Sequence, residues 1–201
     1  MSSSDKELVI LEAASKVFME HGFSASTTDM IQREAGVSKA TLYARFASKE
    51  ALFFAVIERQ CGRLERAVLE IEPVSGDLRS TLSALGRAYL DIVLSVAGLA
   101  LFRVVVAEAP RFPQLARHFF VRGPQLMNRA VAKLLTLAAA HGEIDLQGVG
   151  VDAAAGLFVG MLRGEAQMEC VTHPASRVSE VQCDAWVQLA VNAFLKAHAT
   201  G

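Results

Sequence analysis

Two short helix-forming segments joined by the sequence AGVS, residues 35–38, limit most strongly how this chain can fold. The first segment covers about residues 28–35 and ends at Gly36, as helices commonly end at glycine. Ser38 is placed to cap the second segment, residues 39–46. A tight turn that contains glycine sets the second helix across the first. The pattern predicts a helix-turn-helix.

The rest of the chain predicts further helices and no sheet. Alanine and leucine are abundant, there are only 5 prolines among 201 residues, and strand-type alternation is scarce. We therefore expect an all-α fold. Beside the two short helices, the expected helices cover about residues 5–21, 48–71, 77–96, 98–109, 113–122, 124–141, 151–171 and 179–199.

Composition excludes several classes of protein. The longest apolar run, residues 92–102, is shorter than the roughly 20 residues of a membrane span. The N-terminus MSSSDKELVI lacks the basic start and apolar core of a signal peptide. The number of cysteines is odd, 3, which predicts reduced thiols in the core of a cytoplasmic protein. The net charge of −1 gives no support for nucleic-acid binding, so that function must rest on local placement.

The second short helix has two different faces. Residues 37–49 contain Lys39, Arg45 and Lys49 and no carboxylate. Lys39 shares one face with small or polar neighbours, whereas Leu42 and Phe46 point elsewhere and are expected to pack on the first two helices. A slim polar face with apolar anchors behind it is what a helix in the DNA major groove requires.

The chain resembles the TetR family of bacterial repressors. The resemblance covers residues 5–54 almost continuously and is carried by the runs GF at 22–23, TTDMI at 27–31, AGVSK at 35–39, TLY at 41–43, RF at 45–46 and SKEALF at 48–53. The later run FRVVVAEAPRFP, residues 102–113, is similar to the AefR-like subfamily.

The resemblance implies a homodimer with two heads that bind a palindromic operator in double-stranded DNA. It divides the chain into a DNA-binding domain, residues 1–50, and an all-helical domain for effector binding and dimerisation, residues 51–201, with the helix from 48 linking them. It further implies that an effector moves this linking helix and the DNA-binding heads, and that the last two helices form a four-helix dimer interface.

Eight residues are expected to contact DNA. Lys39 and Tyr43 are placed for phosphate or base edges, and Arg45 and Lys49 for the backbone, with the amides at the start of the fourth helix adding attraction. Asp29 leaves a base contact from the first short helix in doubt. The full set is Thr28, Ser38, Lys39, Ala40, Thr41, Tyr43, Arg45 and Lys49.

Two further sites are predicted in the second domain. Three glycines recur every four residues and allow close helix approach, which fits a dimer interface or a helix crossing within the chain. We favour a dimer interface with the last helix, formed by Gly156, Gly160, Gly164, Trp186, Leu189, Ala190 and Phe194. Bulky apolar residues on the central helices are candidates for a pocket that holds a small hydrophobic or aromatic effector: Tyr89, Phe102, Val106, Phe119, Met127 and Met161.

Catalytic and metal signatures are weak. Glu165, Glu169 and His173 lie at i, i+4 and i+8, but Pro174 ends the helix there, so we expect no metal site and no cofactor. The sequence has no HExxH, GxSxG, P-loop or GxGxxG motif, so we expect no enzyme. The favoured hypothesis is a ligand-responsive repressor. An effector-independent architectural or cell-division factor of the same fold is the alternative, and activation instead of repression stays open.

Overall fold

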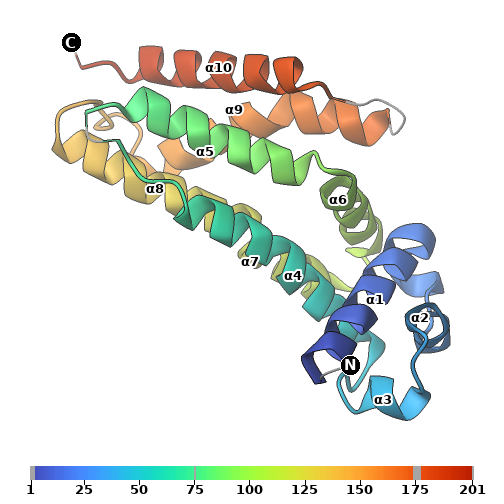
Figure 1. Ribbon diagram of the computed structural model, residues 1–201. Coiled ribbons are helices and arrows are strands. Elements are labelled where there is room, and N and C mark those ends of the chain that lie inside the picture. Colours follow the sequence, from blue (N-terminus) through green and yellow to red (C-terminus); the bar gives the residue numbers. More distant parts are fainter. Residues whose placement is uncertain (1–2, 75, 174–177, 201) are drawn as a thin grey trace. The chain divides into compact units, whose positions relative to one another are not determined.

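The computed structural model describes residues 3–74, 76–173 and 178–200, and within them every regular element is a helix. The prediction of an all-α fold is confirmed. The helices are α1 (Ser3–Ala25), α2 (Thr28–Ala35), α3 (Lys39–Tyr43), α4 (Lys49–Leu69), α5 (Leu78–Val93), α6 (Val96–Glu108), α7 (Pro113–Arg122), α8 (Pro124–Ala140), α9 (Val151–Thr172) and α10 (Glu180–Ala197) (Figure 1).

The chain separates into two compact units, each built from two stretches of sequence. The first unit comprises Met1–Gly62 and Ala100–Arg122, and the second comprises Arg63–Leu99 and Gly123–Gly201. The expected DNA-binding domain, residues 1–50, lies within the first unit. That unit also contains α7 and most of α6, which the sequence-based division at residue 50 assigns to the other domain.

Aromatic rings and the apolar stripe of α1 form the core of the first unit. Ile10 and Phe18 are fully buried, and the Phe18 ring lies 5.0 Å from that of Phe53 and 5.7 Å from that of Phe23. The regular path of α1 is broken at Gly22, whose φ of 76° is readily adopted by glycine. This break brings Phe23 back into the core.

Local capping fixes the turn between α2 and α3. The Thr27 side chain accepts a hydrogen bond from the Met30 amide, and the Ser38 side chain accepts one from the Thr41 amide. Gly36 closes α2 in the left-handed conformation, at φ 63°. The helix α3 is shorter than predicted, because it ends at Tyr43 and not at Phe46, yet Phe46 is still buried.

The second unit packs α5, α8, α9 and α10 around one apolar core (Figure 1). Met127, Phe158 and Phe194 are among its buried residues. At Gly86 on α5, an added Cβ would lie 2.9 Å from Leu162 on α9 and 3.2 Å from Val187 on α10. Glycine therefore permits the close approach of these three helices.

No single helix in the described stretches is long and apolar enough to cross a membrane; α5 and α6 reach the necessary length and composition only jointly, across a bend. The apolar run 92–102 covers that break.

The three cysteines are buried, as the sequence predicts. Burial raises the pKa of Cys61 to about 11, with a smaller contribution from Glu58, so this thiol stays protonated at neutral pH.

Candidate nucleic-acid interface

The helix α3 presents its polar face to solvent and its apolar face to the core. The Lys39 side chain is 63% exposed, and Tyr43 is 42% exposed. Leu42, between them, is 1% exposed and belongs to the core of the first unit. The anchor predicted behind the polar face is therefore present.

The start of α2 contributes to the same surface. The hydroxyls of Thr28 and Tyr43 lie 3.0 Å apart and form a hydrogen bond. The Lys39 ammonium lies 3.4 Å from the Asp29 carboxylate and 5.9 Å from the centre of the Tyr43 ring. Side chains that are ten or more residues apart in sequence thus form one exposed polar network.

Ser38 and Thr41 hold the turn together. Beside capping the Thr41 amide, the Ser38 hydroxyl lies 2.8 Å from that of Thr41. Ala40, which like Thr41 lies on α3, is exposed and small. Both hydroxyls therefore have a structural partner within the head, and Ala40 leaves the surface of α3 slim.

Arg45 lies close to an acid on α1. Its guanidinium is 3.8 Å from the Glu7 carboxylate, and its side chain is 29% exposed. Sequence patterns did not indicate this pair, because 38 residues separate the two side chains. A separation of 3.8 Å in partly exposed groups is a weak interaction, so Arg45 can exchange it for another anion.

Lys49 has a different geometry from the one that the sequence predicts. Its ammonium donates hydrogen bonds to the carbonyl oxygens of Phe23 at 2.9 Å, Ser24 at 3.4 Å and Ser26 at 2.9 Å. It also lies 4.5 Å from the centre of the Phe23 ring. This ammonium is therefore directed at carbonyl oxygens near the end of α1, and its contact with DNA phosphate stays a prediction.

The end of α6 is hydrogen-bonded to the same bend. One carboxylate oxygen of Glu108 accepts from the Ser24 amide at 2.7 Å, and the other accepts from its hydroxyl at 2.6 Å. Burial alone would raise the pKa of Glu108. The Ser24 hydrogen bonds, with the charges of Arg111 and Lys49, outweigh it and lower the pKa below its ordinary value. No sequence pattern indicates this connection, because 84 residues separate Ser24 from Glu108.

The helix α7 is tied to α4 by charge. Glu58 on α4 lies 2.7 Å from His118 Nε2 and accepts two hydrogen bonds of 2.9 Å from the Arg122 Nε. The His118 ring meets Phe54 edge to face, at 4.8 Å between centres. The spacing of His118 and Arg122, at i and i+4 on one helix, is the sequence signal that could have indicated a shared acidic partner.

The six residues predicted to line a pocket are divided between the two units. Tyr89 and Met127 are buried in the second unit, where burial raises the pKa of Tyr89 against a smaller opposing effect of Arg163. Phe102 and Phe119 belong to the first unit, with ring centres 6.4 Å apart. Val106 and Met161, which the sequence also predicts as lining residues, are 55% and 43% exposed.

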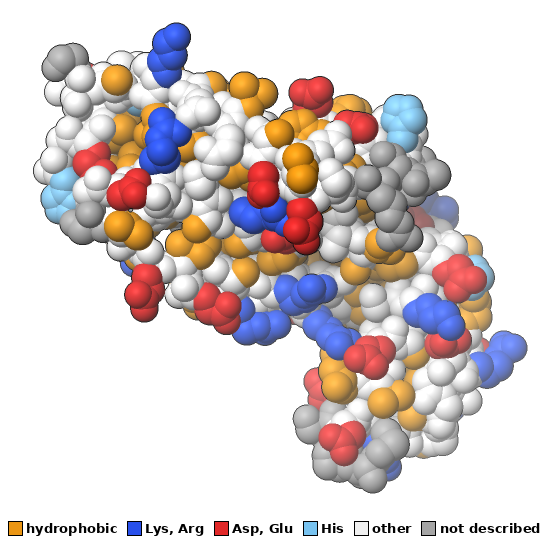
Figure 2. All heavy atoms as spheres, turned by 45° about the horizontal axis from the view of Figure 1, so that its top comes forward, with side chains coloured by type: hydrophobic (Ala, Val, Ile, Leu, Met, Phe, Trp, Pro, Cys, Tyr) orange, Lys and Arg blue, Asp and Glu red, His pale blue; other side chains and the backbone are white. Residues whose placement is uncertain are grey.

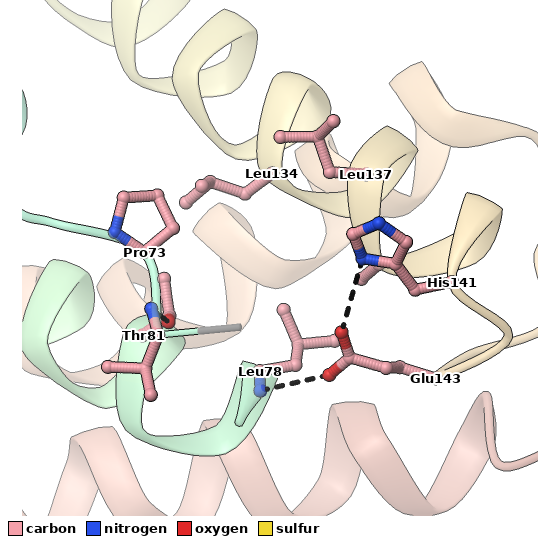
Figure 3. Close-up of a pocket in the computed structure, with 9 residues that line it drawn as sticks. Pro73, Leu78, Thr81, Leu134, Leu137, His141 and Glu143 are labelled. Atoms are coloured by element: carbon pink, nitrogen blue, oxygen red, sulfur yellow. Dashed lines mark hydrogen bonds and ion pairs between the residues drawn. The ribbon is translucent and has the colours of Figure 1, made fainter. Parts of the chain in front are cut away.

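A small cavity of about 120 Å³ lies elsewhere in the second unit (Figure 3). Its wall is largely apolar, with His141 and Glu143 on one side; the Glu143 carboxylate accepts a hydrogen bond from the Leu78 amide at 3.2 Å. None of the six predicted residues lines it. The lining residues are Pro73, Val74, Leu78, Thr81, Leu134, Leu137, Ala138, His141 and Glu143.

The outer faces of α9 and α10 are apolar and exposed. Nothing lies within 4 Å of a Cβ placed on Gly156, Gly160 or Gly164, so this ridge packs against no part of its own chain that is described. The exposed hydrophobic residues on these helices are Leu157, Met161, Met168, Val181 and Leu189. Figure 2, in which the α10 side of Figure 1 comes forward, shows hydrophobic side chains reaching the surface of this unit.

Two residues predicted at the dimer interface lie inside the unit instead. Ala190 and Phe194 are only 4% and 1% exposed, and the Phe194 ring packs on Phe158 at 5.2 Å. Trp186 is half-buried, and Leu189 is 65% exposed. The interface prediction is therefore corrected for Ala190 and Phe194, which face the core because they follow the buried stripe of α10.

Family models match both parts of the chain. Residues 10–56 match the model described as bacterial regulatory proteins of the tetR family, and residues 80–200 match the C-terminal domain of the AefR-like transcriptional repressors. The chain belongs to the TetR family. Transcription regulation through a DNA-binding helix-turn-helix is the activity that this membership establishes.

Solved structures extend the likeness over the whole TetR-family chain. The flavonoid-responsive regulator FrrA is 35% identical, with 98% of each chain covered and a TM-score of 0.80. A TetR-family regulator from Mesorhizobium loti is 25% identical over 100% of each chain, with a TM-score of 0.86.

Curated relatives are matched over part of their length. The transcriptional activator FasR of Mycolicibacterium smegmatis is 38% identical over 84 residues, which are 42% of this chain and 38% of FasR. The chain thus aligns with less than half of FasR, which is an activator, whereas the matched C-terminal family model describes repressors.

Proposed function

We propose that this TetR-family regulator is a homodimeric repressor that binds a palindromic operator and releases it when a small aromatic compound binds. The observation that carries the DNA-binding part is the exposed network of Thr28, Lys39 and Tyr43, held above the buried Leu42. We call the surface formed by Thr28, Ser38, Lys39, Ala40, Thr41, Tyr43 and Arg45 the α2–α3 surface.

The chemistry of the α2–α3 surface suits the major groove. Lys39 stands at the start of α3, where helix-turn-helix proteins contact base edges, and Ala40 is small enough to approach a thymine methyl group. Thr28 and Tyr43 supply hydroxyls for phosphate, and Arg45 supplies a second cation. Lys49 stabilises the head through the α1 carbonyls, while the amides at the start of α4 attract phosphate.

The outer faces of α9 and α10 support dimerisation. Leu157, Met161 and Leu189 are exposed there at 55%, 43% and 65%, beside the glycine ridge that allows close approach. Contiguous apolar patches on a monomer surface mark sites of association. We infer that a second copy of the chain covers them, which would give the dimer two α2–α3 surfaces, one for each half-site of a palindrome.

The relatives support an aromatic effector and repression. FrrA responds to flavonoids, and the C-terminal family model describes repressors, although FasR is an activator. The cavity of about 120 Å³ is below the roughly 300–1,000 Å³ that ligands of drug size occupy. A flavonoid-sized effector would therefore repack the second unit, around Tyr89 and Met127 in our proposal. Its site of action would be the bacterial cytoplasm.

DNA binding is tested with the variant Lys39→Ala/Arg45→Ala and the control Lys16→Ala, an exposed lysine on α1. Fluorescence anisotropy with duplexes from the DNA upstream of the gene measures affinity between 50 and 200 mM salt. Two cations per head, four per dimer, predict an affinity loss of roughly 100-fold over that range for the wild type. The double variant should lose most of this dependence. Salt-independent binding by the wild type would refute the assigned surface.

The effector is tested on the preformed complex. Aromatic compounds that raise the melting temperature of the protein should also release the duplex. An effector of this kind binds the conformation without DNA more tightly than the DNA-bound one, and this difference in affinity shifts the equilibrium between the two conformations. A compound that stabilises the protein but leaves DNA bound would count against repression relieved by that compound, and would favour the effector-independent alternative.

A further inference from the structure

An acid lies beside Lys39 of the α2–α3 surface. The Asp29 carboxylate is 59% exposed and lies 3.4 Å from the ammonium of Lys39, the first residue of α3. An acid in the first turn of α2 is favoured by the helix dipole. Capping is already provided by Thr27, whose side chain accepts from the Met30 amide at 3.2 Å. The dipole does not explain why the carboxylate lies beside the residue best placed to contact bases.

An acid on this surface has a cost in DNA binding. A carboxylate repels phosphate and offsets the charge of Lys39, so it weakens binding to any sequence that gives it no hydrogen-bond donor. In the major groove, the exocyclic amine of cytosine is such a donor, and carboxylates accept from it. Lysine in turn contacts O6 and N7 of guanine.

The spacing of the two side chains matches one base pair. Guanine O6 and cytosine N4 are hydrogen-bonded to each other and so lie about 2.9 Å apart. The 3.4 Å between Lys39 Nζ and Asp29 Oδ1 is comparable. In an A·T pair, the adenine amine lies between two acceptors, N7 and thymine O4, and N7 would repel the carboxylate.

We propose that Asp29 is a specificity-determining residue, which together with Lys39 recognises one G·C base pair in each half-site. The inference rests on the proposed DNA-binding function. On other sequences the carboxylate is left without a donor and weakens binding, so the acid increases the difference between operator and random DNA. Asp29 is thus kept on the surface although it lowers the total attraction for DNA.

The test is a selection from a randomised duplex library with the full-length wild type and Asp29→Ala. The wild type should enrich one G·C pair symmetrically in both half-sites, and Asp29→Ala should lose that enrichment. Exchange of this pair for A·T should weaken the wild type by about tenfold or more, and the variant by less than about threefold. Affinity of the variant for random duplex should rise, with a salt slope steeper by about 0.9 per head.

The matched control is Glu34→Ala. Glu34 lies on the same helix, carries the same charge, and is paired with Lys16 at 2.7 Å and not with α3. This variant should keep the wild-type preference for G·C, because exposed ion pairs contribute little.

The outcomes separate the two proposals. A wild type that enriches no sequence contradicts the proposed DNA-binding function. A wild type that enriches an operator which Asp29→Ala recognises equally well, or a Glu34→Ala variant that loses discrimination to the same extent, overturns the role of Asp29 alone. Enrichment of A·T at the position sensitive to Asp29 overturns the assignment of the base pair.

Discussion

Replacing Lys49 with methionine distinguishes a stabilising lysine from a DNA-binding one. Methionine keeps most of the aliphatic length but removes the ammonium that bonds to Phe23, Ser24 and Ser26. We expect the variant to lose stability, because these hydrogen bonds are lost, and to keep the salt dependence of DNA binding. If Lys49 contacts phosphate, as the sequence predicts, the stability stays and the salt slope falls by about 0.9 per head.

The size of the stability loss follows from the contacts. Two hydrogen bonds of 2.9 Å from a charged donor contribute roughly 1.5 kcal/mol each at the lower end of the range, and the bond of 3.4 Å contributes little. The contact with the Phe23 ring adds about 0.5–1 kcal/mol. In the variant, water hydrogen-bonds to some of the carbonyls that Lys49 leaves unpaired, so we expect the free energy of unfolding to fall by about 2–4 kcal/mol in total. For a chain of this size, that lowers the melting temperature by about 5–15 °C.

Urea unfolding followed by circular dichroism measures this loss, at one fixed protein concentration because a dimer is stabilised by its own concentration. The matched control is Lys39→Met, whose side chain is 63% exposed and should change the unfolding free energy by less than about 0.5 kcal/mol. Lys39→Met should instead weaken DNA binding. A Lys49→Met protein with wild-type urea midpoint and a reduced salt slope would refute the role that we assign to Lys49.

Two further predictions concern α6 and α10. Because the folded-state pKa of Glu108 is lowered, its carboxylate stabilises the fold above the ordinary carboxyl pKa, and this stability is lost as pH falls through the folded-state value. Glu108→Gln should therefore lower the free energy of unfolding, measured in urea, by about 1–2 kcal/mol at pH 7 and by progressively less at acidic pH. An equal decrease at every pH would contradict a role for the carboxylate charge. Leu189→Lys should raise the dimer dissociation constant, measured by light scattering, at least about tenfold, because it buries a charge in the interface. The control Leu69→Lys changes a residue that is 77% exposed and should leave this constant unchanged. Equal dissociation constants for the two variants would exclude the α10 face.

Much of the candidate site could be predicted because its determinants are local. Caps and helix-ending residues act within one turn of helix, so Gly36 and Ser38 marked the end of α2 and the start of α3. The end of α3 was placed three residues too late, since residues 44–46 favour a helix but are drawn into a turn where Phe46 packs into the core. Contacts over long sequence distances, such as Thr28 with Tyr43, could not be predicted from spacing.

The sequence by itself determined that this protein is helical, that its helices lie close to the expected ranges, and that residues 28–46 form a helix-turn-helix, because backbone preferences and apolar periodicity are properties of neighbouring residues. Only the tertiary structure decided what each side chain faces. Lys49 binds the end of α1, Glu108 binds Ser24, and Phe194 enters the core while Leu189 stays exposed. Periodicity shows that a helix has two faces, but the neighbouring helices, distant in sequence, decide which face is covered and which charges find partners.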